Sequence, residues 1–200
     1  MDQPVKIGRP RSHGPETAAA LLDAAERVAV ADGPAAVAVR RVADEVGTTT
    51  RAVYSLFGSK DGLLVALATR GFELLAAAVE ALPATNDPVD DVVRAGALSF
   101  RRFVLQHPAL FRIAFQHESV APELIARFDL ARRTALLQLT GRLERVAADG
   151  RLGSTTPAQA ACYFHAMCEG LADMERRGAL GQDPEAHWFS GLRAVVLGLA

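Results

Sequence analysis

The chain has 200 residues, of which 50% are hydrophobic, and its formal net charge is −1. This length and composition allow a substantial buried core, in one domain or two small ones, and exclude a chain that is disordered over most of its length. Because the charges nearly cancel, attraction to nucleic acid has to come from a local concentration of basic residues and not from the chain as a whole.

Residues 1–13 form a basic N-terminal arm, in which Lys6, Arg9 and Arg11 outnumber a single acid, Asp2. Glycine and proline keep such a segment extended, and arginine suits the narrow, negative minor groove of DNA. A solvated tail would have the same composition, so insertion into a groove and a solvated tail both stay open as interpretations.

Prolines that stand just before apolar-periodic runs, and glycines that stand after them, predict about nine helices. The sequence shows no convincing strand alternation, so the predicted fold class is all-α. A polar connector at 82–88 separates an N-terminal three-helix unit from a C-terminal helical bundle, and Asp87, Thr156 and Asp183 are candidate N-caps. The predicted helices span 15–32, 39–46, 50–57, 60–81, 88–106, 108–116, 122–148, 157–177 and 184–199.

Residues 38–57 predict two short helices joined by a tight turn, which is the helix-turn-helix geometry that places a helix in a DNA groove. Gly47 tolerates the positive φ that ends the first helix, and Thr48 or Thr49 can cap the second. The apolar residues of both helices recur at helical spacing and therefore share a buried side. They are Val39, Val42, Ala43, Val46, Ala52, Val53 and Phe57.

The remaining side chains of this segment point outward, and they include donors for phosphates and base edges. Thr50 and Arg51 lie at the N-terminal end of the second helix, so we predict that they contact bases. Phosphate contacts are expected from Thr49, Tyr54 and Lys60. An ordinary helical hairpin within a core is the alternative, but it gives this polar set no role. The candidate DNA-binding residues are Arg40, Thr49, Thr50, Arg51, Tyr54, Ser55 and Lys60, with a solvated face as an equal alternative for Arg40.

The turn and the start of the next helix carry a pattern that is fixed in order and spacing: Gly47, Tyr54, Phe57, Gly58, Ser59, Lys60, Asp61 and Leu63. With this pattern, about residues 14–75 resemble the N-terminal domain of the TetR family of bacterial transcriptional regulators. Two positions depart from it: Thr48, where an apolar residue is common, and Leu56, where an aromatic, histidine or basic residue often contacts the DNA backbone. The resemblance implies a DNA-binding domain of the TetR type at 14–60 and a ligand-binding and dimerisation domain at 61–200.

The C-terminal half resembles the corresponding domain of a TetR subgroup named for a Trp…His-Gly signature. Residues 168–171, Cys-Glu-Gly-Leu, stand in its place, so the glycine and leucine match while glutamate replaces the histidine. The resemblance implies a homodimer formed through the helices at about 157–177 and 184–199. The aromatic residues are most simply core, although in a regulator some line an apolar cavity for an effector, here of unknown identity. The candidate pocket residues are Phe103, Phe111, Phe115, Phe164, His165 and Cys168.

Cys162 and Cys168 lie in an apolar helical segment of a chain without a secretory signal, which predicts free thiols in a reducing, cytoplasmic setting. Together with His165 they recur every three residues, but this spacing spreads the side chains across about a third of the helix circumference. We therefore expect no metal site. No apolar run reaches the roughly 18 uninterrupted residues of a membrane span, so no membrane association is expected.

These features together predict a ligand-responsive transcriptional regulator, a repressor that binds a pseudo-palindromic operator in double-stranded DNA as a homodimer. We expect neither enzymatic activity nor a cofactor, because the sequence has no recognisable catalytic constellation or phosphate-binding loop. The alternative is a helical dimerisation or interaction module, or a small-molecule-binding bundle, that does not bind DNA.

Overall fold

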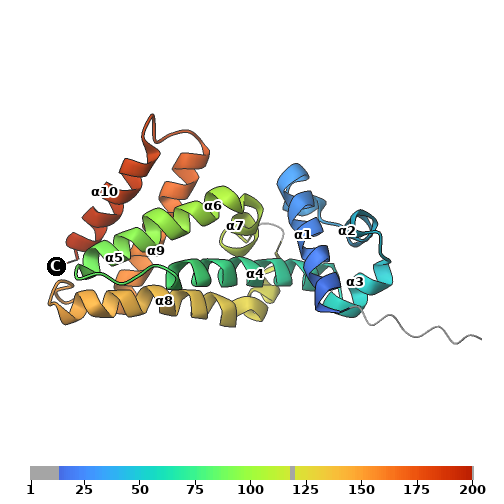
Figure 1. Ribbon diagram of the computed structural model, residues 1–200, viewed down its shortest axis with the longest axis horizontal. Coiled ribbons are helices and arrows are strands. Elements are labelled where there is room, and N and C mark those ends of the chain that lie inside the picture. Colours follow the sequence, from blue (N-terminus) through green and yellow to red (C-terminus); the bar gives the residue numbers. More distant parts are fainter. Residues whose placement is uncertain (1–13, 118–119, 200) are drawn as a thin grey trace, which may run out of the picture. The chain divides into compact units, whose positions relative to one another are not determined.

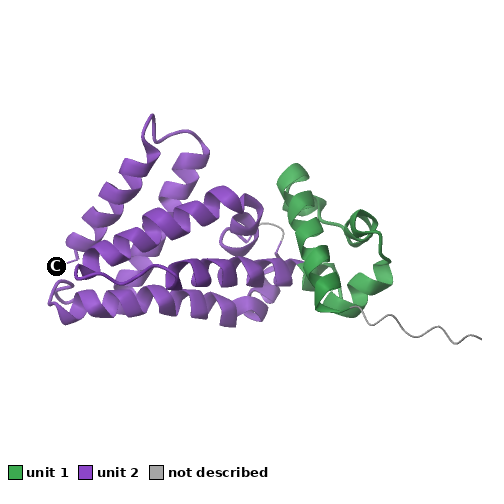
Figure 2. Ribbon diagram, viewed as in Figure 1, with its two compact units in different colours: residues 1–63 green, residues 64–200 purple. Residues whose placement is uncertain are grey.

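The computed structural model describes residues 14–117 and 120–199, and the basic arm lies outside these ranges. Over the described ranges the chain is helical and contains no strand (Figure 1). The all-α fold class predicted from the sequence is confirmed. The chain divides into two compact units, residues 1–63 and 64–200 (Figure 2).

Unit 1 contains three helices and the start of a fourth around a small apolar core. α1 spans Pro15–Asp32, α2 spans Val39–Val46 and α3 spans Thr50–Phe57, with a short 3₁₀ turn at Pro34–Ala36 between the first two. α4 spans Lys60–Glu80, so it begins in unit 1 and ends in unit 2. The fully buried core side chains include Leu21, Ala25, Val28, Val42 and Val53.

Unit 2 is a helical bundle in which α9 contacts both α8 and α10, and α5 contacts the same two helices. The three predicted N-caps are confirmed, because side-chain oxygens of Asp87, Thr156 and Asp183 accept from first-turn N–H groups at 3.0, 3.3 and 3.1 Å. Besides the end of α4, unit 2 contains α5 (Pro88–Arg94), α6 (Arg101–Gln106), α7 (Pro108–Ala114), α8 (Asp129–Ala148), α9 (Pro157–Arg176) and α10 (Pro184–Leu197).

Two predicted helices differ in detail from the structure. The stretch 88–106 contains a π-helical segment at Ala95–Phe100, and Pro122–Phe128 is 3₁₀ rather than α. Apolar periodicity cannot separate these closely related helix types. Within the π-helical segment, a Cβ on Gly96 would lie 2.4 Å from Leu192 Cδ1 and 2.9 Å from Phe164 Cζ, so a larger residue would displace these side chains of α10 and α9.

A partly buried polar network joins α6, α9 and α10. The Arg101 guanidinium pairs with Glu175 at 2.9 Å and with Glu185 at 2.8 Å, and Trp188 Nε1 donates to Glu175 at 2.7 Å. Hydrogen bonding to Glu175, opposed by burial and aided by the charges of both carboxylates, raises the pKa of Arg101. These bonds hold the three helices together.

α4 is the one helix in the described ranges that is long and apolar enough to cross a membrane by length and composition. However, 61% of its apolar window is buried inside the fold, as in the core helix of a water-soluble domain. Its C-terminal end is held by α8, since Arg142 Nη2 donates to the carbonyl oxygens of Val79 and Leu82 at 2.6 and 2.8 Å. A cation is favourable at this end of a helix dipole. The connector that follows is tied to α8 as well, because Arg145 Nη2 donates to the Thr85 carbonyl oxygen at 2.7 Å. Arg145 also pairs with the buried Asp91 of α5.

Candidate DNA-binding surface and ligand cavity

The turn between α2 and α3 has the geometry that its sequence predicts. Gly47 adopts a left-handed conformation with φ of 68°, and the N–H of Thr48 donates to the carbonyl of Ala43 at 3.0 Å to close the end of α2. Of the two threonines that could cap α3, it is Thr49 whose hydroxyl accepts from the Ala52 N–H, at 3.3 Å. These local bonds fix the direction in which α3 leaves the turn.

α3 is anchored on one side and exposed on the other. Ala52 and Val53 are fully buried, whereas Tyr54 is 53% exposed. The residues that we consider for DNA contact are all exposed: Arg40, Thr49, Thr50, Arg51, Tyr54, Ser55 and Lys60. The two neighbouring arginines differ in their contacts and exposure. Arg41 forms an ion pair with Asp32 at 2.5 Å, whereas the Arg40 side chain is 89% exposed. The outward face of α3 therefore consists of hydroxyl, phenol and guanidinium groups.

The start of α4 packs directly on the end of α3. The Ser59 hydroxyl accepts from the Gly62 N–H at 2.9 Å and so caps α4. A Cβ on Gly62 would lie 1.8 Å from the carbonyl oxygen of Phe57, so this position requires glycine. Lys60 Nζ donates to the Ala35 carbonyl at 3.4 Å, which holds the ammonium at the surface. The role of Gly62 has no local sequence signal, because it depends on a contact between two helices.

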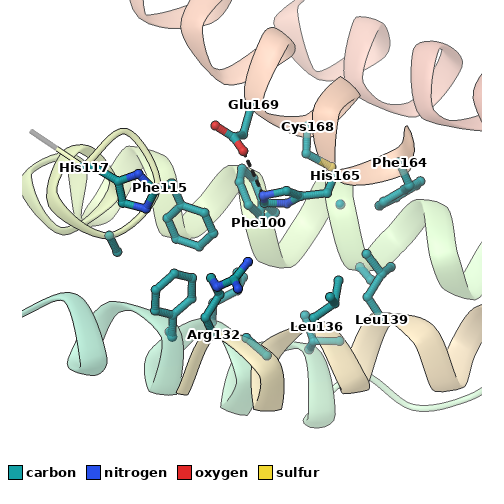
Figure 3. Close-up of a pocket in the computed structure, with 17 residues that line it drawn as sticks. Phe100, Phe115, His117, Arg132, Leu136, Leu139, Phe164, His165, Cys168 and Glu169 are labelled. Atoms are coloured by element: carbon teal, nitrogen blue, oxygen red, sulfur yellow. Dashed lines mark ion pairs between the residues drawn. The ribbon is translucent and has the colours of Figure 1, made fainter. Parts of the chain in front are cut away.

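Unit 2 contains a cavity of about 270 Å³ lined by residues of α4, the π-helical segment, α7 and the turn after it, α8 and α9 (Figure 3). Of the candidate pocket residues, Phe115, Phe164, His165 and Cys168 line it. Phe103 and Phe111 do not, and they are instead core residues behind its wall, only 4% and 0% exposed. The ring centroids of both lie within 6 Å of that of Phe115, so they support a lining residue from behind.

The cavity wall also contains residues outside the candidate pocket set, among them Phe72, Phe100, Arg132 and Glu169. They come from different helices, and only the fold brings them together. Phe72 and Phe100 pack against Phe115 with centroid distances of 4.7 and 5.4 Å, which makes much of the wall aromatic. Its polar groups are few, as is usual for a small-molecule site.

The polar pair on α9 is His165 and Glu169, one helical turn apart, with His165 Nε2 lying 2.8 Å from Glu169 Oε1 (Figure 3). Cys168 lies beside this pair and is buried, and burial together with the charge of Glu169 raises the pKa of its thiol well above the usual range. Cys162 is exposed, so the two cysteines lie on different sides of α9. Within residues 14–117 and 120–199, no group of three potential ligands is placed to hold a metal ion.

A polar face on α3 and a cavity in a separate bundle define a helix-turn-helix protein with a small-molecule-sized pocket. Residues 21–67 match the family model described as bacterial regulatory proteins, tetR family, and residues 93–195 match a tetracyclin repressor-like C-terminal domain. The chain therefore belongs to the TetR family, and it is a DNA-binding transcriptional regulator.

Solved structures share this fold over most of the chain. A Rhodococcus sp. RHA1 protein of unknown function is 25% identical, with a TM-score of 0.81 and coverage of 96% of this chain and 99% of that one. PfmR, a TetR family regulator from Thermus thermophilus, is 21% identical, with a TM-score of 0.68 and coverages of 88% and 96%. FadR from Bacillus subtilis, in complex with stearoyl-CoA, is 17% identical, with a TM-score of 0.75 and coverages of 90% and 98%. A comparison with curated proteins gives no match.

Proposed function

We propose that the protein is a ligand-responsive repressor that acts as a homodimer on a pseudo-palindromic operator, with residues 14–60 binding DNA and residues 61–200 binding ligand and dimerising. The observation that carries the proposal is the division of α3 into two faces. Ala52 and Val53 are fully buried, while Arg51 and its polar neighbours are exposed. A helix anchored on one side that presents donors on the other is suited to a major groove.

The roles follow from position along α3. Thr50 and Arg51 stand in its first turn, where side chains reach base edges, and a guanidinium can donate two parallel hydrogen bonds to a guanine. Thr49, Tyr54 and Lys60 flank them and would hold phosphates, which fix the orientation of the helix without reading sequence. This function places the protein in the cytoplasm, with its DNA, and requires neither a catalytic group nor a cofactor.

A second copy of the chain is the partner that we propose for α9 and α10. Each helix exposes a row of small and apolar residues at intervals of about one turn, whereas a solvated face would carry charges. FadR, PfmR and the other neighbours share the fold of this bundle, and family membership favours pairing through it. The rows are Cys162, Tyr163, Ala166, Gly170 and Met174 on α9, and Ala186, Ser190, Ala194 and Leu197 on α10.

The link to a ligand is α4. This helix begins with Lys60, beside the recognition helix, and its second half contributes Phe72, Leu75 and Val79 to the cavity wall. An effector in the cavity would therefore contact the same helix that starts in the DNA-binding unit. Such an effector releases DNA only if it binds the DNA-free arrangement more tightly than the DNA-bound one.

The test of DNA binding uses operator DNA selected from the region beside the gene or from a random pool, with binding measured by gel shift or fluorescence anisotropy. Arg51→Ala and Tyr54→Ala should each weaken binding about fivefold or more, since a good contact to a base is worth about 1–3 kcal/mol and 1.4 kcal/mol is a factor of ten. Arg127→Ala is the matched control, because Arg127 is an exposed arginine in unit 2. Equal losses for Arg51→Ala and Arg127→Ala would contradict the assignment of α3 as the recognition helix.

The test of dimerisation is the mass in solution, measured by light scattering or sedimentation. The full chain should be a dimer, and Ala166→Arg or Ala194→Arg should produce a folded monomer that binds operator DNA weakly. A full chain that is monomeric in solution and binds an operator with a single half-site would exclude the homodimer. A dimer that binds neither operator nor random DNA at low salt would instead favour an interaction module without DNA binding.

A further inference from the structure

The size of the cavity limits what it can enclose. A cavity of about 150 Å³ lined by apolar side chains holds a benzene ring. By proportion, about 270 Å³ holds roughly eleven carbon atoms. The part of a ligand that the cavity surrounds is therefore of the size of a phenylalkyl group or a medium-length alkyl chain.

The wall of the cavity is mainly aromatic and aliphatic. Phe72, Phe100, Phe115 and Phe164 come from four different parts of the bundle, and Leu139 of α8 lies opposite Phe164 (Figure 3). Burying an apolar body among such side chains is favourable by about 25 cal/mol per Å² of apolar surface. This part of the site selects an apolar body, but it does not decide the charge of the ligand.

Arg132 is the residue of the wall that selects the charge of the ligand. Arg132, Leu136 and Leu139 lie one turn apart along α8 and line the cavity, and the Arg132 guanidinium enters it from the side opposite His165 (Figure 3). Nε and Nη2 of Arg132 donate to Asp129 Oδ1. Among residues 14–117 and 120–199 no hydrogen bond is formed by Nη1, so one edge of the guanidinium is available to a ligand.

The charge at Arg132 is not cancelled by its carboxylate partner. Asp129 is shared, because Arg133 also pairs with it, at 2.5 Å through Oδ2. Two guanidinium groups and one carboxylate leave a local charge of one positive unit. The other acid of the wall, Glu169, is bound to His165 and lies on the far side of the imidazole from Arg132 (Figure 3). A ligand near Arg132 therefore meets an unbalanced positive charge beside an apolar wall.

We propose that this cavity binds a small monocarboxylic acid, with its apolar body among the phenylalanines and its carboxylate on the free edge of the Arg132 guanidinium. A carboxylate matches both the charge and the planar donors of arginine. That this acid acts as an effector rests on the proposed function. That it binds in the cavity does not, because its binding does not require DNA. The ligand class can therefore be tested on the protein alone.

Trp188 is the single tryptophan of the chain, and its ring lies 6.2 Å from that of Phe100 in the cavity wall. Its fluorescence, with calorimetry as a second measurement, can report titrations with four probes: phenylbutanoate, decanoate, decanol and decylamine. The two acids should bind at least tenfold more tightly than decanol, and decylamine should bind more weakly than decanol.

Arg132→Gln should reduce the affinity for decanoate at least tenfold and leave that for decanol unchanged. Arg132→Lys, which retains the charge, should recover part of the loss. Arg127→Gln is the matched control, since Arg127 is an exposed arginine of unit 2 that does not line the cavity, and it should change acid binding less than threefold. Arg132 is half exposed, so these variants should keep the native circular dichroism spectrum.

Equal affinities for decanoate and decanol would overturn the proposal, as would equal effects of Arg132→Gln and Arg127→Gln, or no binding by any probe. Adding saturating decanoate to the operator complex separates the two levels of inference. Acid that binds but does not release DNA leaves the ligand class standing and contradicts ligand-responsive repression. Loss of operator binding in Arg51→Ala should leave the acid titration unchanged.

Discussion

Gly62 is the residue whose replacement tests most directly how the recognition helix is positioned. An alanine Cβ at this position would lie 1.8 Å from the carbonyl oxygen of Phe57 and 2.9 Å from its carbonyl carbon. Phe57 is the last residue of α3, and Gly62 lies in the first turn of α4. Gly62→Ala therefore forces the end of α3 away from the start of α4, because both colliding groups belong to the backbone or are attached directly to it.

The size of the effect follows from the distance. Real Cβ contacts essentially never fall below 3.0 Å, so the backbone has to move by at least about 1.2 Å, the difference between 3.0 and 1.8 Å. Overpacking of a well-packed site costs about 1–3 kcal/mol, and a collision with backbone belongs at the upper end of this range. Since the displaced helix carries Arg51 and Tyr54, we expect operator affinity to fall at least tenfold as well.

The measurements are urea unfolding followed by circular dichroism and operator binding followed by fluorescence anisotropy. Gly141→Ala is the control, because Gly141 also lies inside a helix but has nothing within 4 Å of an added Cβ. It should raise the free energy of unfolding by about 0.5–1 kcal/mol through helix propensity alone, and leave DNA binding unchanged. A Gly62→Ala protein with native stability and native operator affinity would refute the account of the α3–α4 contact.

Three further changes test other parts of the fold and the site. Asp91→Asn should lower the free energy of unfolding by about 2 kcal/mol at neutral pH, because it breaks a buried pair with the half-exposed Arg145. Burial opposes ionisation of Asp91, but hydrogen bonds from Thr85 and Arg145 outweigh it and lower the pKa below the ordinary 3.8, so the difference from the native protein should persist above pH 3.8 and shrink in more acidic urea titrations. Thr49→Ala should cost about 1 kcal/mol in unfolding experiments by removing the cap of α3, and Thr49→Ser should restore it; equal stability of all three proteins would exclude the cap. Lys60→Ala should reduce the slope of log affinity against log salt by about one per subunit in operator titrations, and an unchanged slope would show that Lys60 contacts no phosphate.

The helix-turn-helix could be predicted from the sequence because its signals are local. The apolar spacing of α2, the left-handed glycine at the turn and the threonine cap of α3 each act within a few residues, and each is present in the structure at the expected position. The cap itself could not be assigned between Thr48 and Thr49, since both hydroxyls are within reach until the turn geometry is known.

The cavity could be predicted only in part, because its wall is assembled from helices that are distant in the sequence. Phe103 and Phe111 have the same residue type and helical spacing as Phe115, and only the packing of the bundle decides which ring reaches the cavity. Arg132 has the sequence environment of an ordinary solvated helix face. Its position in the wall depends on the rotation of α8 against α4 and α9, which no local pattern encodes.

The proposed regulatory path runs from the ligand to α8 and from α8 to α4, and this limits how an effector can act. A ligand on Arg132 contacts α8, while Arg142, ten residues later on the same helix, donates to the carbonyls of Val79 and Leu82 at the end of α4. Any shift of α8 along α4 is therefore opposed by these two hydrogen bonds and transmitted through them. By linkage, an effector that weakens operator binding tenfold must itself bind the operator complex tenfold more weakly than the free protein, a coupling of about 1.4 kcal/mol. Equal effector affinities with and without operator would mean that the coupling free energy is zero, and this effector could then not control DNA binding.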